Sequence, residues 1–423
     1  MAVQILDDLE WRGLVAHTTD RETLAAALAG DPLTFYCGFD PTAPSLAFGN
    51  LVQLVTMRRL QQAGHRPIAV VGGATGLIGD PSGKSVERNL NEVDVVATWV
   101  ERIRAQVERY LAFEGPAAAH IVDNLEWTAP VSALDFLREV GKHFNLNRML
   151  DREVVKARLA GVGISYTEFS YQVLQAFDYL ELHRRYGCTL QTGGSDQWGN
   201  LTAGVDLIRR VTGDSVHAMA TPLITRADGT KYAKTDSDTL WLDPSLTSPY
   251  AFYQFFVNVD DADVAPLLKV FSFRTREEID GLADAAAQKP EGREAQLALA
   301  EELTSLVHGA AETERAMAAS RALFGQGELA DLDSGTLDAA LAELSPATVN
   351  APLPPAVELA VAAGLAESRS AARRTIAEGG LYLNNRRVAD PNAIPDAADL
   401  LGGRWLVLRR GKRTLAALEV VRS

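Results

Sequence analysis

Residues 33–64, LTFYCGFDPTAPSLAFGNLVQLVTMRRLQQAG, decide the expected fold of this chain. The first seven of them, Leu33–Phe39, are short, apolar and aromatic, which predicts a buried strand. A polar turn follows, and Phe48–Ala63 predicts a helix closed by Gly64. Amide groups at the start of such a helix can seat a phosphate, although on its own this turn fits an ordinary loop better.

Strand-like and helix-like stretches alternate outward from this segment as far as Ala220. Strands are expected at Pro67–Val71, Ala119–Val122 and Thr189–Gln191, and helices at Asp94–Phe113 and Tyr166–Tyr186. Strands separated by helices predict an α/β fold with a parallel sheet and helices on both faces. Ligands bind beyond the carboxyl ends of the strands in such sheets, so we expect the chemistry in the glycine-rich turns there.

The second half of the chain has a different character. Residues 248–325 predict helices, with a clear periodic stretch at Arg293–His308. Residues 329–355 are richer in Asp, Ser and Pro and predict a linker region. The carboxyl-terminal part, 353–423, is rich in arginine and contains the alternating strand Trp405–Leu408.

The composition is that of a globular protein, with 47% hydrophobic and 23% charged residues among 423. No apolar run reaches the roughly 18 residues of a membrane span, and the amino terminus lacks the pattern of a signal peptide. Cys37 and Cys188 form no CxxC pair, so neither a zinc site nor a disulfide framework is supported. A cytoplasmic enzyme of two or three domains fits these features.

The charge is unevenly distributed. The net charge is −14, yet residues 351–423 hold eleven Lys and Arg against seven Asp and Glu. A basic module on an acidic body can bind a polyanion locally while the body stays soluble. Chance clustering on a solvated surface explains the same count, so charge alone leaves both interpretations open.

Two further segments carry motifs for phosphate chemistry. Residues 72–85, GGATGLIGDPSGKS, end like a Walker loop, but Ile78 stands where that motif needs a glycine, so the spacing disfavours a P-loop nucleotidase. This turn still presents Asp80, a carboxylate that could hold an ammonium group. Residues 228–235, DGTKYAKT, place Lys231 and Lys234 three apart, where they could clamp a pyrophosphate. A solvated loop is the alternative for this segment.

One helix face is unexpectedly polar. Tyr171, Gln175 and Asp178 stand at i, i+4 and i+7 and therefore share a face of the predicted helix. Gln191 and the turn at 193–200 follow. Buried polar groups need partners, and a polar ligand would supply them. A face turned to solvent is the alternative, which the flanking aromatic residues disfavour.

Taken together, these segments resemble the bacterial tyrosyl-tRNA synthetases, which are class I aminoacyl-tRNA synthetases. The matching segments are YCGFDPTAPSL, GGATGLIGDPSGKSVERN, GISYTEFSYQVLQAFDYLEL, LQTGGSDQWGN and DGTKYAKT, in family order and at family spacing. The carboxyl-terminal SRSAARRTIAEGGLYLNNRRV is similar to the small RNA-binding fold that these enzymes carry at their end.

The resemblance implies roles for the matching positions. Tyrosine would be bound by Tyr36 and Asp178 at its hydroxyl, by Asp80, Tyr171 and Gln175 at its ammonium group, and by Gln197 at its carboxylate or the adenylate. ATP and the adenylate would be bound by Gly38, Asp40, Gly49, Asn50, Gly194, Asp196, Lys231 and Lys234. Catalysis would use Thr42, Lys84, Arg88, Lys231 and Lys234, which act on the departing pyrophosphate or on transfer RNA. RNA would be bound by Arg369, Arg373, Arg374, Arg386 and Arg387.

The resemblance also implies an architecture and partners. A Rossmann-like catalytic domain (1–226) would precede a KMSKS-type loop and connector (227–247). A helical anticodon-binding domain (248–328), a linker (329–352) and a ribosomal-protein-like RNA-binding domain (353–423), which is a small α+β module, would complete the chain. The substrates would be L-tyrosine, ATP with Mg²⁺, and tRNA(Tyr), and the enzyme would be a homodimer.

The chain departs from the family at the signature HIGH, which here is Ala47-Phe48-Gly49-Asn50. Asn50 can still form hydrogen bonds, whereas Ala47 removes the first histidine, which in the family acts with the Thr42 position on the departing phosphates. We therefore expect an active synthetase with altered adenylation. A synthetase-like protein that binds tyrosine or RNA without catalysis, and an enzyme that delivers tyrosine to another acceptor, are the alternatives.

Overall fold

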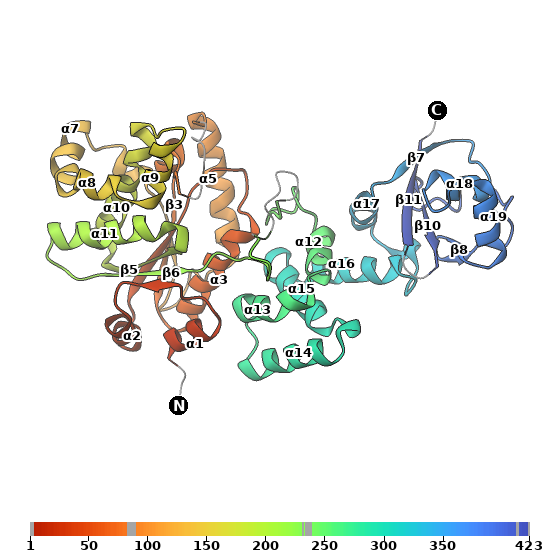
Figure 1. Ribbon diagram of the computed structural model, residues 1–423, viewed down its shortest axis with the longest axis horizontal. Coiled ribbons are helices and arrows are strands. Elements are labelled where there is room, and N and C mark those ends of the chain that lie inside the picture. The colour runs from red at the N-terminus through yellow and green to blue at the C-terminus, as the bar shows by residue number, and fades with distance from the viewer. Residues whose placement is uncertain (1–3, 83–89, 231, 233–238, 412–413, 422–423) are drawn as a thin grey trace. The chain divides into compact units, whose positions relative to one another are not determined.

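A computed structural model describes residues 4–82, 90–230, 232, 239–411 and 414–421. The described chain forms two compact units (Figure 1). The first consists of residues 1–243 and 261–283, and the second of residues 244–260 and 284–423. None of the described helices is both long enough and apolar enough to cross a membrane.

A six-stranded sheet in the order β1-β6-β5-β2-β3-β4 organises the first unit. The strands from β6 to β4 are parallel, and only β1 runs antiparallel to its neighbour β6. The central strand β2 pairs with β3 and β5, so its carboxyl end lies in the middle of the sheet edge. The strands are β1 (His17–Thr18), β2 (Thr34–Phe39), β3 (Arg66–Val71), β4 (His120–Asp123), β5 (Cys188–Gly194) and β6 (His217–Thr221).

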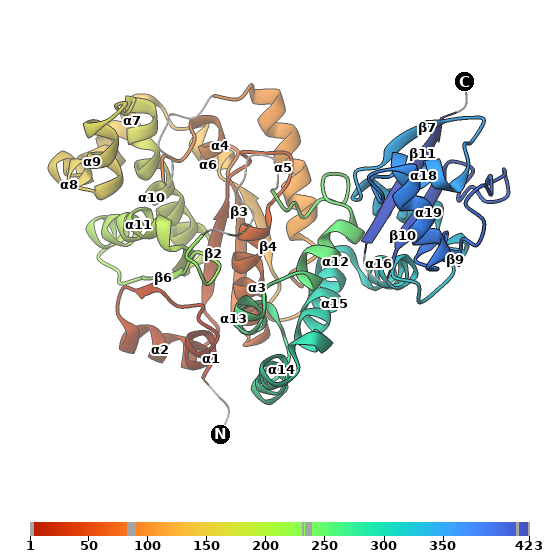
Figure 2. The same ribbon diagram turned by 45° about the vertical axis from the view of Figure 1, so that its right-hand side comes forward.

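Helices cover both faces of this sheet, as the alternation of strand-like and helix-like stretches predicts. Figures 1 and 2 show α10 and α11 on one face and α3 and α5 on the other. The helices of this unit are α1 (Ile5–Trp11), α2 (Arg21–Ala29), α3 (Phe48–Gln62), α4 (Thr75–Ile78), α5 (Val93–Val107), α6 (Leu125–Thr128), α7 (Ala133–Asp135), α8 (Leu146–Leu150), α9 (Glu153–Ala160), α10 (Tyr166–Tyr186), α11 (Trp198–Val211) and α13 (Asp261–Phe271).

The helix α10 begins and ends where the sequence predicts. The hydroxyl of Ser165 accepts a hydrogen bond from the amide of Glu168, which caps its first turn. Gly187 ends it with a φ of 62°, a left-handed conformation that glycine adopts without strain. The apolar face of α10 packs Phe177 and Leu180 into the core beneath the sheet. Its polar face remains available for the pocket described below.

The second unit begins with helices and ends with a second sheet. Its five strands follow the order β7-β11-β10-β8-β9, with β7 parallel to β11 and the other pairs antiparallel. The helices are α12 (Pro249–Val257), α15 (Glu294–His308), α16 (Ala310–Leu323), α17 (Ser334–Ala342), α18 (Ala356–Ala362) and α19 (Arg369–Ala377), while α14 (Arg276–Gln288) contains the boundary between the units. The strands are β7 (Ala347–Asn350), β8 (Leu381–Leu383), β9 (Arg386–Arg387), β10 (Trp405–Arg410) and β11 (Thr414–Val421).

The predicted fold class is confirmed: a parallel α/β sheet is followed by helices and by an α+β module with its own sheet. Two local differences are informative. The helix predicted for 94–113 ends at Val107, and the chain then turns through Tyr110 and Leu111, which are buried although they are not helical. The segment predicted as a linker contains α17 and the edge strand β7, because Val349 packs into the core of the second sheet. The sequence-derived domain boundaries themselves stay predictions.

Candidate active site

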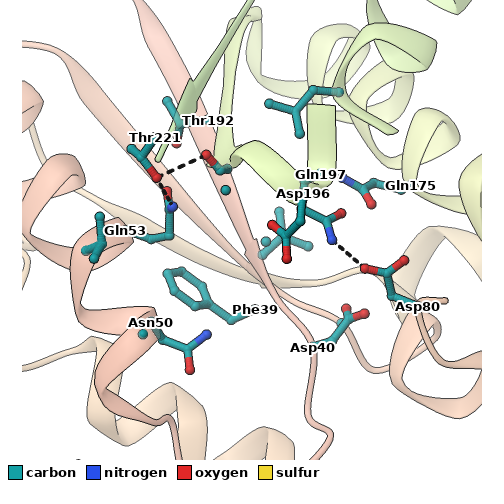
Figure 3. Close-up of a pocket in the computed structure, with 18 of the residues that line it drawn as sticks. Phe39, Asp40, Asn50, Gln53, Asp80, Gln175, Thr192, Asp196, Gln197 and Thr221 are labelled. Atoms are coloured by element: carbon teal, nitrogen blue, oxygen red, sulfur yellow. Dashed lines mark hydrogen bonds between the residues drawn. The ribbon is translucent and has the colours of Figure 1, made fainter. Parts of the chain in front are cut away.

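A cavity of about 410 Å³ opens at the carboxyl ends of β2, β3, β5 and β6. Turns and helix ends that are far apart in the sequence meet here (Figure 3). The cavity gathers the sequence-predicted residues Tyr36, Gly38, Asp40, Thr42, Gly49, Asn50, Asp80, Tyr171, Gln175, Asp178, Gly194, Asp196 and Gln197. The remaining predicted residues of this site, Lys84, Arg88, Lys231 and Lys234, lie outside the described residues.

Asp178 is a buried carboxyl in the wall of the cavity. One of its oxygens accepts a hydrogen bond from Nε1 of Trp127 at 2.8 Å, and the other accepts one from Nδ2 of Asn124 at 2.9 Å. Burial raises the pKa of Asp178 to about 8, because desolvation outweighs the stabilising hydrogen bonds from Asn124 and Trp127. Asn124 and Trp127 therefore orient the carboxyl of Asp178, while burial favours its protonated form.

Tyr36 lies on β2 and is also buried in this wall. Its hydroxyl has no hydrogen-bond partner among the described residues. Burial, together with the nearby Asp178, raises the pKa of Tyr36 well above its ordinary value, so the hydroxyl keeps its proton. A buried hydroxyl without a partner costs free energy, and a polar ligand in the cavity would remove that cost.

A chain of hydrogen bonds joins Asp178 to Asp40, a second carboxyl that lines the cavity. Nδ2 of Asn124 donates to Oγ1 of Thr75 at 3.0 Å as well as to Asp178. The hydroxyl of Thr75 donates to Asp40 at 2.7 Å, and the hydroxyl of Tyr171 donates to the other oxygen of Asp40 at 2.5 Å. The carboxyl groups of Asp40, which directly follows β2, and Asp178, which lies on α10, are thus held in one network.

The sequence did not reveal Asn124 and Thr75, which link this network. Both follow strand ends, Asn124 directly after β4 and Thr75 in the glycine-rich turn after β3. Position after a strand end is the signal that could have identified them. The cavity also includes Gln53, Thr192, Thr221 and Tyr232, which the sequence likewise did not reveal.

A second polar cluster lies at the start of α11. Nε2 of Gln197 donates a short hydrogen bond to Asp80, whose other oxygen accepts from the amide of Ser82 at 2.9 Å. Nδ2 of Asn200 donates to Oε1 of Gln197 at 3.0 Å, which fixes the orientation of that amide. Oε1 of Gln175 is buried in the wall and has no partner among the described residues. This cluster offers a carboxylate and an amide oxygen, the groups that suit an ammonium ligand.

Glycines leave room where the network and the cavity need it. A Cβ on Gly72 would lie 2.2 Å from Oδ1 of Asp40, and a Cβ on Gly73 would lie 2.3 Å from Oδ1 of Asp123. Any side chain at these positions would displace a carboxylate. By contrast, no described residue lies within 4 Å of a Cβ on Gly38 or Gly49, both of which line the cavity. These two positions keep the cavity itself open.

The start of α3 carries the unusual signature. Oδ1 of Asn50 accepts a hydrogen bond from the amide of Ala47 at 3.0 Å, which caps the first turn. This bond fixes the side-chain amide of Asn50, a residue that also lines the cavity. Phe48 donates its backbone amide to the carbonyl of Leu240 at 2.8 Å, and Ala47 forms an antiparallel bridge with Trp241. The chain that follows the lysine segment is thereby attached to the signature helix.

The residues just before Lys231 form a tight turn. The amide of Arg226 donates to the carbonyl of Thr230 at 2.7 Å, and the amide of Thr230 donates to Asp228 at 2.8 Å. The buried carboxylate of Asp263 accepts from the amide of Ala227 at 2.7 Å. The lysine segment therefore begins from an anchored turn.

The predicted RNA-binding arginines lie on the second unit. Arg369, Arg373 and Arg374 belong to α19, and Arg386 and Arg387 form β9; all five are exposed. Arg369 pairs with Glu358 at 3.1 Å. An exposed ion pair of this kind contributes little to stability, so Arg369 is available to another anion.

No three His, Cys, Asp or Glu side chains gather as a metal-binding set within the described ranges.

Comparison with known proteins identifies the family. Residues 28–325 match the model of the class I tRNA synthetases (W and Y), and residues 338–418 match that of the tyrosine–tRNA ligase SYY-like C-terminal domain. The tyrosine–tRNA ligase of Streptomyces avermitilis is 62% identical over 98% of this chain and 99% of that protein, and that of Mycobacterium tuberculosis is 57% identical over 99% of each.

A solved structure agrees in fold. The C-terminally truncated mitochondrial tyrosyl-tRNA synthetase of Aspergillus nidulans superimposes with a TM-score of 0.69 at 29% identity and covers 75% of this chain and 93% of that one. The family membership of this chain follows from the bacterial relatives, which are 57% and 62% identical to it over 98–99% of its length. The chain belongs to the tyrosine–tRNA ligase family of class I aminoacyl-tRNA synthetases.

Proposed function

We propose that this synthetase activates L-tyrosine with ATP to give tyrosyl-adenylate and then transfers tyrosine to tRNA(Tyr). The observation that supports the choice of amino acid is that two polar groups line the same cavity: the hydroxyl of Tyr36, which has no hydrogen-bond partner among the described residues, and the buried carboxyl of Asp178. A phenol can accept from the first and donate to the second. Phenylalanine would leave the hydroxyl of Tyr36 without a partner and would offer no donor to Asp178.

The expected selectivity is large. Tyrosyl enzymes are themselves the known example of this effect, where rejection of phenylalanine reaches about 10⁵-fold, a figure that comes from those enzymes rather than from this chain. The cost arises because a buried polar group without a partner loses its full hydration. Tryptophan would additionally need a wider cavity between β2 and α10.

The remaining groups suit the other end of the substrate. Asp80 is a carboxylate, Tyr171 presents its phenol, and Gln175 presents a buried amide oxygen that lacks a partner among the described residues. Together they suit the ammonium group of the amino acid. Gln197, which is tied to Asp80, lies beside the expected position of the carboxylate or the adenylate.

In the first step a carboxylate oxygen of tyrosine attacks the α-phosphorus of ATP, and the bond to the bridging oxygen of pyrophosphate breaks. Asp40, Gly38, Gly194 and Asp196 would border the nucleotide, while Thr42 would donate to the departing phosphates. Lys231, Lys234, Lys84 and Arg88 are assigned to pyrophosphate or RNA by resemblance, and they lie outside the described residues. Mg²⁺ bound to ATP as part of the substrate would neutralise phosphate charge.

In the second step a terminal ribose hydroxyl of the transfer RNA attacks the carbonyl carbon of the adenylate, and AMP leaves. The exposed arginines of α19 and β9 support binding of the RNA, because such side chains form phosphate contacts. The domain ranges given by sequence resemblance, including the anticodon-binding assignment of 248–328, belong to this proposal. Work on transfer RNA makes the cytoplasm the expected location.

The altered signature, Ala47-Phe48-Gly49-Asn50, is expected to affect the rate of adenylation. Ala47 offers no side-chain donor, and the backbone amide of Ala47 is already bound to Asn50. One preorganised donor in a transition state is worth about 10²–10³ in rate. We therefore propose that adenylation proceeds without a donor at this position and is slower for it.

A homodimer is also part of the proposal. Large apolar side chains are exposed along residues 134–166 of the first unit, including Leu134 at 80%, Val162 at 71% and Tyr166 at 73%. A buried ion pair between Arg158 and Glu168, at 2.6 Å, stiffens the loop that carries Val162. An apolar surface on a rigid support is typical of a protein interface.

Tyrosine-dependent exchange of pyrophosphate into ATP tests the proposal, with phenylalanine and tryptophan as controls. Exchange with tyrosine alone, followed by charging of tRNA(Tyr), is the expected result. Tyrosine binding without exchange would overturn it in favour of a synthetase-like binding protein. Exchange without charging would instead indicate another acceptor for tyrosine.

A further inference from the structure

A tight turn of two asparagines connects β8 and β9 in the second unit. The turn is Asn384-Asn385, with φ values of 46° and 64°. Two consecutive left-handed residues are typical of the tight hairpin turn whose twist matches the flanking strands, and asparagine tolerates this conformation well. The turn leads directly into Arg386 and Arg387.

The two asparagines make different contacts. Asn384 serves the hairpin's own sheet, because its Nδ2 donates to the carbonyl of Asp399 at 2.6 Å and its Oδ1 accepts from the amide of Val407 at 2.9 Å. Asn385 reaches out of the sheet instead. Its Nδ2 donates to the carbonyl of Ala322 at 2.6 Å and is 3.3 Å from that of Gly327.

The carbonyls that Asn385 contacts belong to the end of α16. The amide of Gln326 donates to the carbonyl of Arg321, and the amide of Gly325 donates to that of Ala322, which together form a closed helix terminus. Gly325 has a φ of 84°, as this terminus requires. Ala322 thus accepts a second bond, from a residue 63 positions later in the chain.

A second side chain of the module lies against the same terminus. The guanidinium of Arg409 stacks on the ring of Tyr382 at 4.2 Å, and its Nη2 lies 3.2 Å from where a Cβ on Gly325 would be. The same guanidinium donates to the carbonyl of Gly411 at 2.6 Å, which fixes its direction. The end of α16 is therefore held by an amide and contacted by a fixed cation.

We propose that Asn385 is a positioning residue for RNA binding, which attaches the carboxyl-terminal sheet to the end of α16. This inference rests on the proposed function, in that Arg386 and Arg387 bind RNA. Because the hydrogen bond from Asn385 to Ala322 attaches the turn to α16, Arg386 and Arg387 keep a fixed position relative to the helices of the same unit. A transfer RNA that contacts both parts then meets a preformed surface, and the second contact gains from a high effective concentration.

Replacement of Asn385 by glycine isolates this contact. Glycine adopts the positive φ of this position without strain, so the hairpin remains possible while the amide donor is lost. Asn384→Gly is the matched control, because it changes the adjacent position of the same turn and leaves the contact with α16 in place. Arg386→Ala and Arg387→Ala remove one expected phosphate contact each.

The measurement is the dissociation constant of tRNA(Tyr) from the full-length enzyme as a function of salt, alongside pyrophosphate exchange. We expect Asn385→Gly to weaken binding about 3- to 30-fold, in line with the loss of two hydrogen bonds, with an unchanged salt slope. Pyrophosphate exchange should stay at the wild-type rate. Each arginine variant should instead lower the salt slope by about one.

Small-angle scattering of the free enzyme gives a readout independent of RNA. Asn385→Gly should enlarge the radius of gyration or increase its spread, and Asn384→Gly should not. If Asn385→Gly kept the wild-type affinity for tRNA(Tyr) and the wild-type radius of gyration while the arginine variants bound more weakly, the role of Asn385 would be overturned. The RNA-binding role of the arginines would then still stand. Equal loss of affinity in both asparagine variants would also overturn it, since a distorted hairpin would then be the cause. Unchanged affinity in both arginine variants would overturn the RNA-binding role and the inference with it.

Discussion

Nδ2 of Asn124 donates to Oδ2 of Asp178 at 2.9 Å, across 54 positions of sequence. The same amide group donates to Thr75, so Asn124 determines how the carboxyl of Asp178 faces the cavity. Trp127 completes the arrangement through its indole nitrogen. The amino-acid selectivity proposed above depends on this orientation, because the remaining acceptor capacity of Asp178 must be directed at a phenol.

Asp178→Asn tests that orientation. We expect kcat/KM for tyrosine in pyrophosphate exchange to fall about 10- to 100-fold, since an amide replaces a charge-capable acceptor and one NH₂ group must face an existing donor. We expect kcat/KM for phenylalanine to fall much less, so the ratio of kcat/KM for tyrosine to that for phenylalanine should decrease. Trp127→Phe, which removes only one donor to Asp178, should show a smaller loss; equal losses for both amino acids would contradict the assignment.

The raised pKa of Asp178 predicts a pH dependence of stability. Burial raises it from 3.8 to about 8, so the folded chain holds a proton that the unfolded chain releases over this window. The resulting stabilisation is complete below about pH 4 and is lost as the pH rises through 8. The unfolding temperature of the ligand-free wild type, relative to that of Asp178→Asn, should therefore decrease from pH 5 to pH 9. A constant difference would show that Asp178 is ionised throughout.

Ala47→His restores the donor that the signature lacks. We expect tyrosine-dependent pyrophosphate exchange to accelerate by about 10²–10³-fold, with the KM for tyrosine unchanged, because the added group acts on the departing phosphates. The measurement is the initial exchange rate at saturating ATP and tyrosine. An unchanged or lower rate would mean that another group already supplies the contact.

Gly49→Ala tests the open side of α3. Within the part of the chain that the structure describes, nothing lies within 4 Å of a Cβ at Gly49 or at Gly281 in α14, and both are exposed helical glycines. Either alanine should stabilise its helix by about 0.5–1 kcal/mol. Only Gly49→Ala should raise the KM for ATP, by about 10-fold or more, because its methyl group enters the cavity. Equal ATP kinetics in the two variants would exclude contact between the nucleotide and this helix.

Val162→Lys tests the proposed dimer surface. A lysine in the centre of an apolar interface loses hydration without gaining a partner, so we expect dissociation into monomers at micromolar concentration. Leu297→Lys on α15 is the control, because Leu297 is exposed at 43% and lies outside residues 134–166. Sedimentation velocity distinguishes the two, and a dimer that persists in Val162→Lys would move the interface elsewhere.

Local chemistry explains what could be predicted before the fold was known. The helix at Tyr166–Tyr186 could be predicted because Ser165 directly precedes it and Gly187 directly follows it in the sequence. The common face of Tyr171, Gln175 and Asp178 follows from the helix period, and all three line the cavity. The strand β7 was missed because so short a segment in a polar context carries too little pattern, and its partner β11 comes at the far end of the module.

The sequence by itself determined the family, most of the longer elements and most of the polar groups around the cavity, because periodicity, caps and motifs depend on neighbouring residues. Only the tertiary structure decided the partners of those groups. Asn124 meets Asp178 because the fold brings the end of β4 beside the middle of α10, and Asn385 meets Ala322 because a hairpin packs on a helix end. Hydrogen bonds between distant residues depend on how whole elements pack, and no local pattern encodes that packing.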